Sequence, residues 1–224
     1  MELLIYNLLI LAHVLLFVYW LGADLGVLHA ARYAVDPQIP VEARRAIGEI
    51  MSFVDLFPRL SVPLIGAVGV SMATISGDFR ISEIWLWLVW FAAVVWVLVN
   101  LIIYRNRHRI TEMGSWLRFD LIWRSTILLL ATAAGAASLA GIGFTDNVSL
   151  ALKLLIYAAA IALSLLLRTL FRPYRPALAR IEAGGDDAEN SAIMDRALSR
   201  ARPVVLAIWF LTVVAAALGL WQPF

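Results

Sequence analysis

Long uninterrupted runs of apolar residues dominate this chain, and the segments between them hold nearly all of its charged side chains. A helix that crosses the hydrocarbon core of a bilayer needs about 17–25 predominantly apolar residues. Six segments meet this requirement, so the pattern predicts an all-α, polytopic membrane bundle that forms one domain over residues 1–224. The predicted spans cover residues 3–30, 60–76, 84–104, 121–144, 150–171 and 204–221.

The composition excludes a water-soluble globular domain and an intrinsically disordered chain. Apolar residues make up 62% of the sequence, charged residues 15%, and the mean hydropathy is +0.86. Soluble domains are about 45–50% apolar and about 25% charged. The chain has no cysteine, which excludes disulfides, thiolate zinc sites and cysteine-ligated iron–sulfur clusters. Its three histidines, His13, His29 and His108, leave few nitrogens for a metal or haem.

The arginines predict the orientation in the membrane. Segments 31–59, 105–118 and 172–202 hold four, four and six of them, whereas the short links on the other side hold only Arg80. The positive-inside rule makes these three segments cytoplasmic loops and puts both termini outside, in the periplasm if the source is a bacterium. We therefore expect a multi-pass protein of the inner membrane. Orientation accounts for the arginines, so no nucleic-acid partner is expected.

Ionisable residues inside a membrane span are costly and are functional candidates by default. His13 lies about 15 Å along the first helix, toward its outer half, on the same line as Trp20 and Asp24. Its imidazole could ligate haem iron, relay protons or hydrogen-bond to another helix. His29 lies about 24 Å further along and on another side of the helix, so the two histidines are alternative ligands and cannot share a metal.

Acidic and basic residues gather where the first two spans reach the cytoplasmic side. Asp24 and Arg32 share a helix face, and Asp55 precedes Arg59 by four residues. Such a cluster can bind a carboxylate or phosphate group, or it can be a set of salt bridges between helix ends. Lys153 lies near the outer end of the fifth span. A lysine at this position can extend its ammonium group to the membrane–water interface.

The sequence contains three further signals, which concern helix packing and the structure of the last cytoplasmic loop. Gly22 and Gly26 form a small-residue pattern that predicts close helix contact, within one protomer or in a homodimer. Asn100, inside the third span, is expected to hydrogen-bond to a neighbouring helix. Residues 192–201 predict a short helix that ends before Pro203, either a solvated connector, a docking helix or one lying on the membrane.

The segment 11–22, with His13 and then Trp20, resembles the opening helix of the bacterial membrane protoporphyrinogen oxidase family and of the related copper-resistance protein D group. The stretch 59–66 resembles the start of their second span, and 150–154 resembles a lysine-containing span entry. The resemblance implies that His13 is an axial ligand of haem b and that Lys153 lies near the haem or its substrate. The lysine lies in the fifth span here and in the third in that family.

The resulting hypothesis is a haem-b redox protein that oxidises a porphyrin or exchanges electrons with a quinone. His13 or His29 would hold the iron, Arg59 with Arg32 would hold propionates or a substrate carboxylate, and a redox partner or membrane complex would exchange electrons. One alternative is a transporter for a metal or small anion that uses Asp24. The other is a non-catalytic subunit of a membrane complex.

Overall fold

A computed structural model describes residues 2–107, 109, 113–185 and 187–221, and its elements are all α-helices. His108 lies outside this described part of the chain. The helices are α1 (Glu2–Ala34), α2 (Val41–Val54), α3 (Leu56–Ile75), α4 (Glu83–Arg105), α5 (Gly114–Leu139), α6 (Val148–Leu170), α7 (Tyr174–Glu182) and α8 (Asp187–Trp221).

The prediction of an all-α bundle with six membrane-spanning helices is confirmed. Six helical segments are long and apolar enough to cross a bilayer, and each contains most of one predicted span. The fourth differs at its end, since α5 stops at Leu139 whereas the prediction ran to residue 144. Gly141 follows with a φ of 76°, a left-handed conformation that terminates a helix.

The segments predicted as loops at one end of the bundle are largely helical. α1 continues to Ala34, α2 fills much of 31–59, and α7 and the start of α8 fill much of 172–202. The prediction that a short helix ends before Pro203 is wrong, because α8 runs through this proline. A proline removes one helical hydrogen bond, and packing by neighbouring helices can offset that loss.

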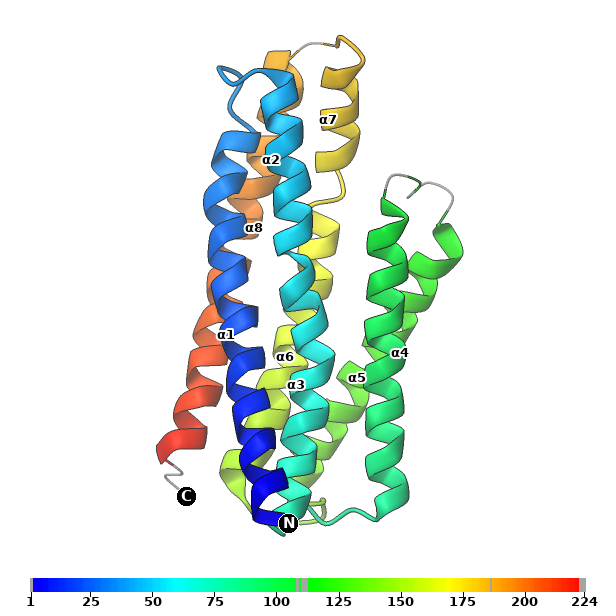
Figure 1. The fold of residues 1–224 in the computed structure, drawn as a ribbon, viewed down its shortest axis with the longest axis vertical. Coiled ribbons are helices and arrows are strands. Elements are labelled where there is room, and N and C mark those ends of the chain that lie inside the picture. Colours follow the sequence, from blue (N-terminus) through cyan, green and yellow to red (C-terminus); the bar gives the residue numbers. More distant parts are fainter. Residues whose placement is uncertain (1, 108, 110–112, 186, 222–224) are drawn as a thin grey trace.

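The end of α1, α2, α7 and the start of α8 extend beyond the ends of α4 and α5 and pack together, and we call this part the extension (Figure 1). Its apolar core is Ala31, Val35, Ala177, Ile181, Met194 and Leu198. The core accounts for the continuous α8, because the apolar side of residues 192–201 is buried rather than exposed as on a solvated connector.

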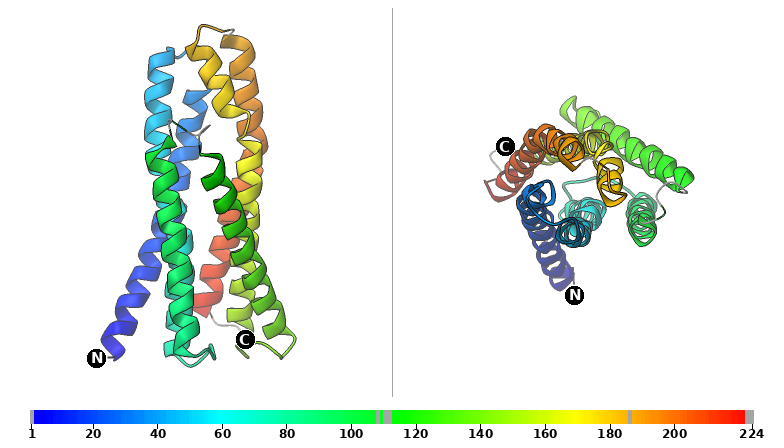
Figure 2. Two further views of the ribbon diagram at one scale, coloured as in Figure 1. Left: turned by 90° about the vertical axis from the view of Figure 1, so that its right-hand side faces the viewer. Right: turned by 90° about the horizontal axis from the view of Figure 1, so that it is seen from above.

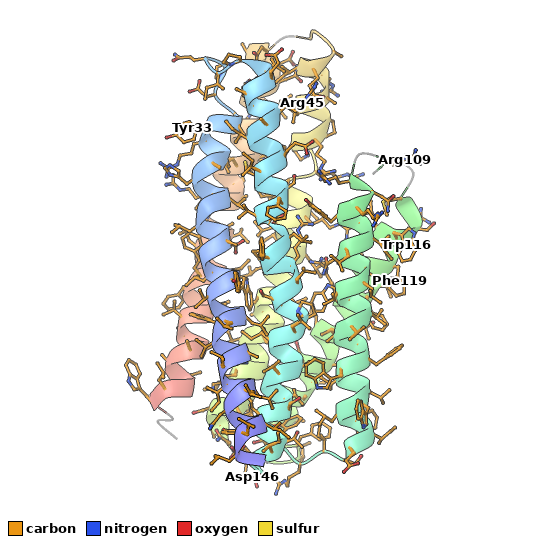
Figure 3. All side chains as sticks on the ribbon, viewed as in Figure 1. Tyr33, Arg45, Arg109, Trp116, Phe119 and Asp146 are labelled. Atoms are coloured by element: carbon orange, nitrogen blue, oxygen red, sulfur yellow. The ribbon has the colours of Figure 1, made fainter. Side chains whose placement is uncertain are left out.

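Arg44 of α2 crosses this extension and is fully buried. Its guanidinium donates to Asp187 Oδ1 at 2.7 Å and to Ser191 Oγ at 2.8 Å. Asp187 lies at the tip of α8, and hydrogen bonds from Ser191 and Arg44 hold the pKa of its carboxyl below its usual range. The adjacent Arg45 instead points outward at the tip (Figure 3) and pairs with Glu182 at 2.9 Å.

The chain begins and ends at the opposite end of the bundle, where α1 starts and α8 finishes (Figures 1 and 2). Around the bundle, α1 packs on α3, α3 on α4, α5 on α6, and α6 on α8. The helices α1 and α8, and likewise α4 and α5, are also neighbours, but they pack more loosely than the four pairs just named. Large apolar side chains such as Leu3, Trp87, Leu129 and Leu220 remain exposed, as lipid contact requires.

Candidate functional site

One face of α3 carries a line of polar contacts that extends along the helix. Positions 55, 59, 62, 66 and 69 are spaced by three and four residues, so they lie on one side of the helix. They cover about 21 Å of helix axis, roughly two-thirds of a bilayer core of about 30 Å. We call these positions and the side chains that they contact the α3 polar line.

At the end of the line nearest the termini, His13 of α1 lies against Gly69. A Cβ at position 69 would be 3.2 Å from His13 Cε1, and His13 Nδ1 is buried without a hydrogen-bond partner. Lys153 of α6 lies close enough for its charge to act on this imidazole. The Lys153 ammonium also approaches α8, at 3.2 Å from where a Cβ on Gly219 would be. His13 thus packs α1 on α3, and Lys153 packs α6 on α8.

Tyr157, one turn after Lys153 on α6, continues the line. Its hydroxyl donates to the carbonyl of Val62 at 3.0 Å. The phenol crosses Gly66 so closely that a Cβ there would lie 2.8 Å from Tyr157 Oη. A side chain at position 66 would therefore force this ring to move.

At the other end of the line, the structure brings Asp24, Asp55 and Arg59 together, as the sequence predicted. Arg59 Nε donates to Asp55 Oδ2 at 2.7 Å, and a second guanidinium nitrogen contacts the same oxygen. Asp24 is half-buried on α1, facing Asp55, Arg59 and the indole of Trp209. The Arg59 side chain is still 48% exposed, so the cluster is accessible and not sealed within the bundle.

A second network adjoins this cluster, and the sequence indicated only its Asn100. The amide of Asn100 donates to the Arg59 carbonyl at 3.0 Å and accepts from Arg124 at 2.9 Å, which confirms the predicted interhelical bond. Asp120, whose side chain is 5% exposed, accepts from Arg124 at 2.9 Å and from Arg168 at 3.0 Å. The four-residue spacing of Asp120 and Arg124 on one helix is the sequence signal that could have indicated their ion pair.

Arginine outnumbers acid at this end of the line. Arg175 of α7 lies near Arg59 and Arg107, and its guanidinium donates to the Arg107 carbonyl at 3.1 Å. Within the described residues it forms no ion pair with a carboxylate. Arg107 pairs with Glu49 at 2.9 Å, so the acid whose charge acts on Arg175 is Asp55, which Arg175 shares with Arg59.

Two predicted site residues lie away from the α3 polar line. His29 is exposed on α1, with its ring edge on Tyr33 at a centroid distance of 5.6 Å. Arg32 is exposed and lines a pocket between α1 and α8, so the structure does not bring it to Arg59. Gly26 packs on Val54 of α2, while Gly22 lines a groove between α1 and α8.

The donor set offers little to a metal. The described residues contain no group of three His, Asp or Glu side chains that could hold an ion. His13 Nδ1 is a nitrogen without a hydrogen-bond partner, but Gly69 lies against the same ring. A Cβ at position 69 would be 3.7 Å from this nitrogen. A porphyrin on Nδ1 would require α1 and α3 to separate, so this packed arrangement does not fit haem at that atom.

No family model matches the chain, and neither a curated protein nor a solved structure is detectably similar to it.

Proposed function

We propose that this chain is a proton-coupled membrane transporter of a small anion, with protons moving along the α3 polar line. The observation that carries the proposal is the placement of ionisable side chains from three helices on one interior face of α3. They are His13 and Asp24 of α1, Asp55 and Arg59 at the start of α3, and Tyr157 of α6. Lys153 lies one turn before Tyr157 on α6, and its charge acts on His13.

This arrangement suits proton transfer because acids and bases inside a membrane commonly form relays. His13 and Lys153 are the groups nearest the termini, and Asp24 and Asp55 are the acids nearest the extension. Tyr157 lies between them and can exchange its hydroxyl proton with ordered water. The distances between successive groups of the line exceed the length of one hydrogen bond, so water molecules would bridge them.

An anion is the favoured solute because two arginines beside the line, Arg59 and Arg175, share the charge of one carboxylate, Asp55. Arg59 is accessible, and Arg175 nearby forms no ion pair with a carboxylate of the described residues. Guanidinium groups bind carboxylate and phosphate oxygens through paired hydrogen bonds. The arginine-rich extension would face the cytoplasm by the positive-inside rule, so the anion would meet these groups from that side.

The test is transport by the purified protein in proteoliposomes that contain a pH-sensitive dye. An imposed gradient of chloride, inorganic phosphate or acetate should change the internal pH, and Asp24→Asn should abolish that change. Asp146→Asn is the matched control, because Asp146 is an exposed acid at the opposite end of the bundle (Figure 3). Equal fluxes for wild type and Asp24→Asn, or no flux with any of these anions, would refute the proposal.

A haem-b redox protein is the second proposal, and it requires α1 and α3 to separate at Gly69 or the iron to bind a nitrogen other than His13 Nδ1. The observation in its favour is that the charge of Lys153 acts on His13, since the family resemblance implies both residues. Purified protein should then show a Soret band that His13→Ala abolishes, or His29→Ala if that residue is the ligand. Colourless protein from haem-replete cells would exclude this proposal and leave the transporter proposal intact.

A further inference from the structure

The loose seam between α1 and α8 contains two hollows that follow one another along the helices. A pocket of about 260 Å³ lies beside the extension and is lined by Leu28, Arg32, Asp195, Leu198, Ser199 and Arg202. A groove of about 510 Å³ continues toward the termini, between residues 17–25 of α1 and 209–213 of α8. Leu25 of the groove and Leu28 of the pocket are one turn apart on α1, so the two hollows are neighbours along the seam.

The pocket is polar and carries a positive charge. Arg32 and Arg202 are exposed, and neither forms an ion pair with a carboxylate of the described residues. Asp195 also lines the pocket, so the three side chains give it a net charge of about +1 at neutral pH. Ser199 adds a hydroxyl and a free carbonyl, because Pro203 has no N–H to donate to that carbonyl.

The pocket lies at the level where both helices enter the membrane. Arg202 is the last charged residue of α8, followed by 203–221 without a charge, and Arg32 is the first arginine of α1. The uncharged stretch of α8 is about 28 Å long, close to the thickness of a bilayer core of about 30 Å. The two guanidinium groups are therefore near the depth of lipid phosphates.

The groove is apolar along its whole length. Phe17, Leu21 and Leu25 form one wall, and Trp209, Phe210 and Val213 form the other. Trp209 lies about 10 Å along α8 from Arg202, within the reach of an acyl chain whose phosphate is at the pocket. The absence of a side chain at Gly22 leaves the groove open, since nothing lies within 4 Å of where its Cβ would be.

We propose that the α1/α8 seam binds one phospholipid with a single net negative charge, of the phosphatidylglycerol type. Arg32 and Arg202 hold the phosphate, Ser199 and Asp195 accept hydrogen bonds from the headgroup hydroxyls, and an acyl chain fills the groove. Basic pockets at the ends of membrane helices recognise acidic headgroups in this way. The proposal is independent of the transport function.

Native mass spectrometry of the detergent-purified protein tests this binding, with phosphatidylglycerol, phosphatidylethanolamine or phosphatidylcholine added at equal concentration. One phosphatidylglycerol should be retained at least about tenfold more strongly than either other lipid. The double variant Arg32→Gln/Arg202→Gln should lose this preference. Arg196→Gln/Arg200→Gln is the matched control, because both residues are exposed on α8 outside the pocket.

A second variant tests the groove separately from the charges. Gly22→Leu should fill it and reduce retention while Arg32 and Arg202 remain. Equal retention of phosphatidylglycerol by wild type, Arg32→Gln/Arg202→Gln and Gly22→Leu would overturn the proposal. Stronger retention of phosphatidylethanolamine than of phosphatidylglycerol by wild type would overturn it as well. Displacement of the lipid by inorganic phosphate alone would indicate a free-anion site instead, and a dimer that dissociates on Gly22→Leu would indicate a second copy of the chain in the seam.

Discussion

The side-chain amide of Asn100 donates a hydrogen bond of 3.0 Å to the main-chain carbonyl of Arg59. This carbonyl has no donor within its own helix, because the residue four positions later is Pro63. Inside a membrane each backbone polar group needs an internal partner. Asn100 therefore supplies from α4 the hydrogen bond that the proline removes from α3, and its amide oxygen accepts from Arg124 of α5.

We expect Asn100→Ala to lower the free energy of unfolding by about 1–3 kcal/mol, since it leaves buried polar groups without partners. Pro63→Ala restores an N–H to α3, so the loss on Asn100→Ala should be about 1 kcal/mol smaller in that background. Unfolding in mixed micelles of detergent and denaturing surfactant, measured for the four members of the cycle, checks this coupling. Strictly additive effects would contradict the pairing of Asn100 with Pro63.

The spans and Asn100 could be predicted because hydropathy and a lone intramembrane amide are local signals. The extension could not be predicted in the same way. Arg44 marks segment 31–59 as a charged loop, yet this arginine is buried by Asp187 and Ser191, which lie more than 140 positions later. The electrostatic effect of Lys153 on His13 depends in the same way on how α1 and α6 are placed in the bundle, which no spacing within either helix encodes.

Asp120→Asn should be among the most destabilising single substitutions in the bundle. The Asp120 carboxylate is 5% exposed and compensates the charges of Arg124 and Arg168. Loss of one partner from a buried ion pair costs about 3–5 kcal/mol. The variant should unfold at lower surfactant concentration than wild type.

The control is Asp146→Asn, because the pair of Asp146 with Arg80 is exposed on both sides. Exposed ion pairs contribute about 0–1 kcal/mol, so this variant should behave as wild type. Similar losses for the two variants would show that the Asp120 network does not hold α5 and α6 together.

Arg44→Ala should open the extension locally and leave the membrane helices folded. It removes three hydrogen bonds of the guanidinium, to the Asp36 carbonyl, Ser191 and Asp187, and a buried side chain, so the local opening free energy should fall by about 2–4 kcal/mol. Hydrogen–deuterium exchange should show faster exchange in α2, α7 and the start of α8. Arg45→Ala, one position along and paired only at the surface, should leave exchange unchanged.

The contribution of Asp187 should depend on pH. Hydrogen bonds from Ser191 and Arg44 lower the pKa of this carboxyl in the folded state. Its contribution to stability is therefore complete above the unfolded pKa of about 3.9 and is lost as the pH falls through the lower folded value. The melting temperatures of wild type and Asp187→Asn should differ by a constant amount from pH 7 to pH 5, and the difference should shrink only below about pH 4. A difference that already shrinks above pH 5 would contradict a lowered pKa for Asp187.

Gly66→Ala tests the contact of the Tyr157 ring of α6 with α3. The added methyl would lie 2.8 Å from Tyr157 Oη and 2.9 Å from the adjacent ring carbon, so the phenol must move and its bond to the Val62 carbonyl must break. Forcing an extra carbon into a packed interior costs about 1–3 kcal/mol.

Gly48→Ala is the control, because a Cβ there meets nothing within 4 Å and alanine favours a helix by up to about 1 kcal/mol. The apparent melting temperature in detergent should fall for Gly66→Ala and stay level or rise for Gly48→Ala. Equal melting temperatures for the two variants would mean that α3 and α6 are not in contact at Gly66.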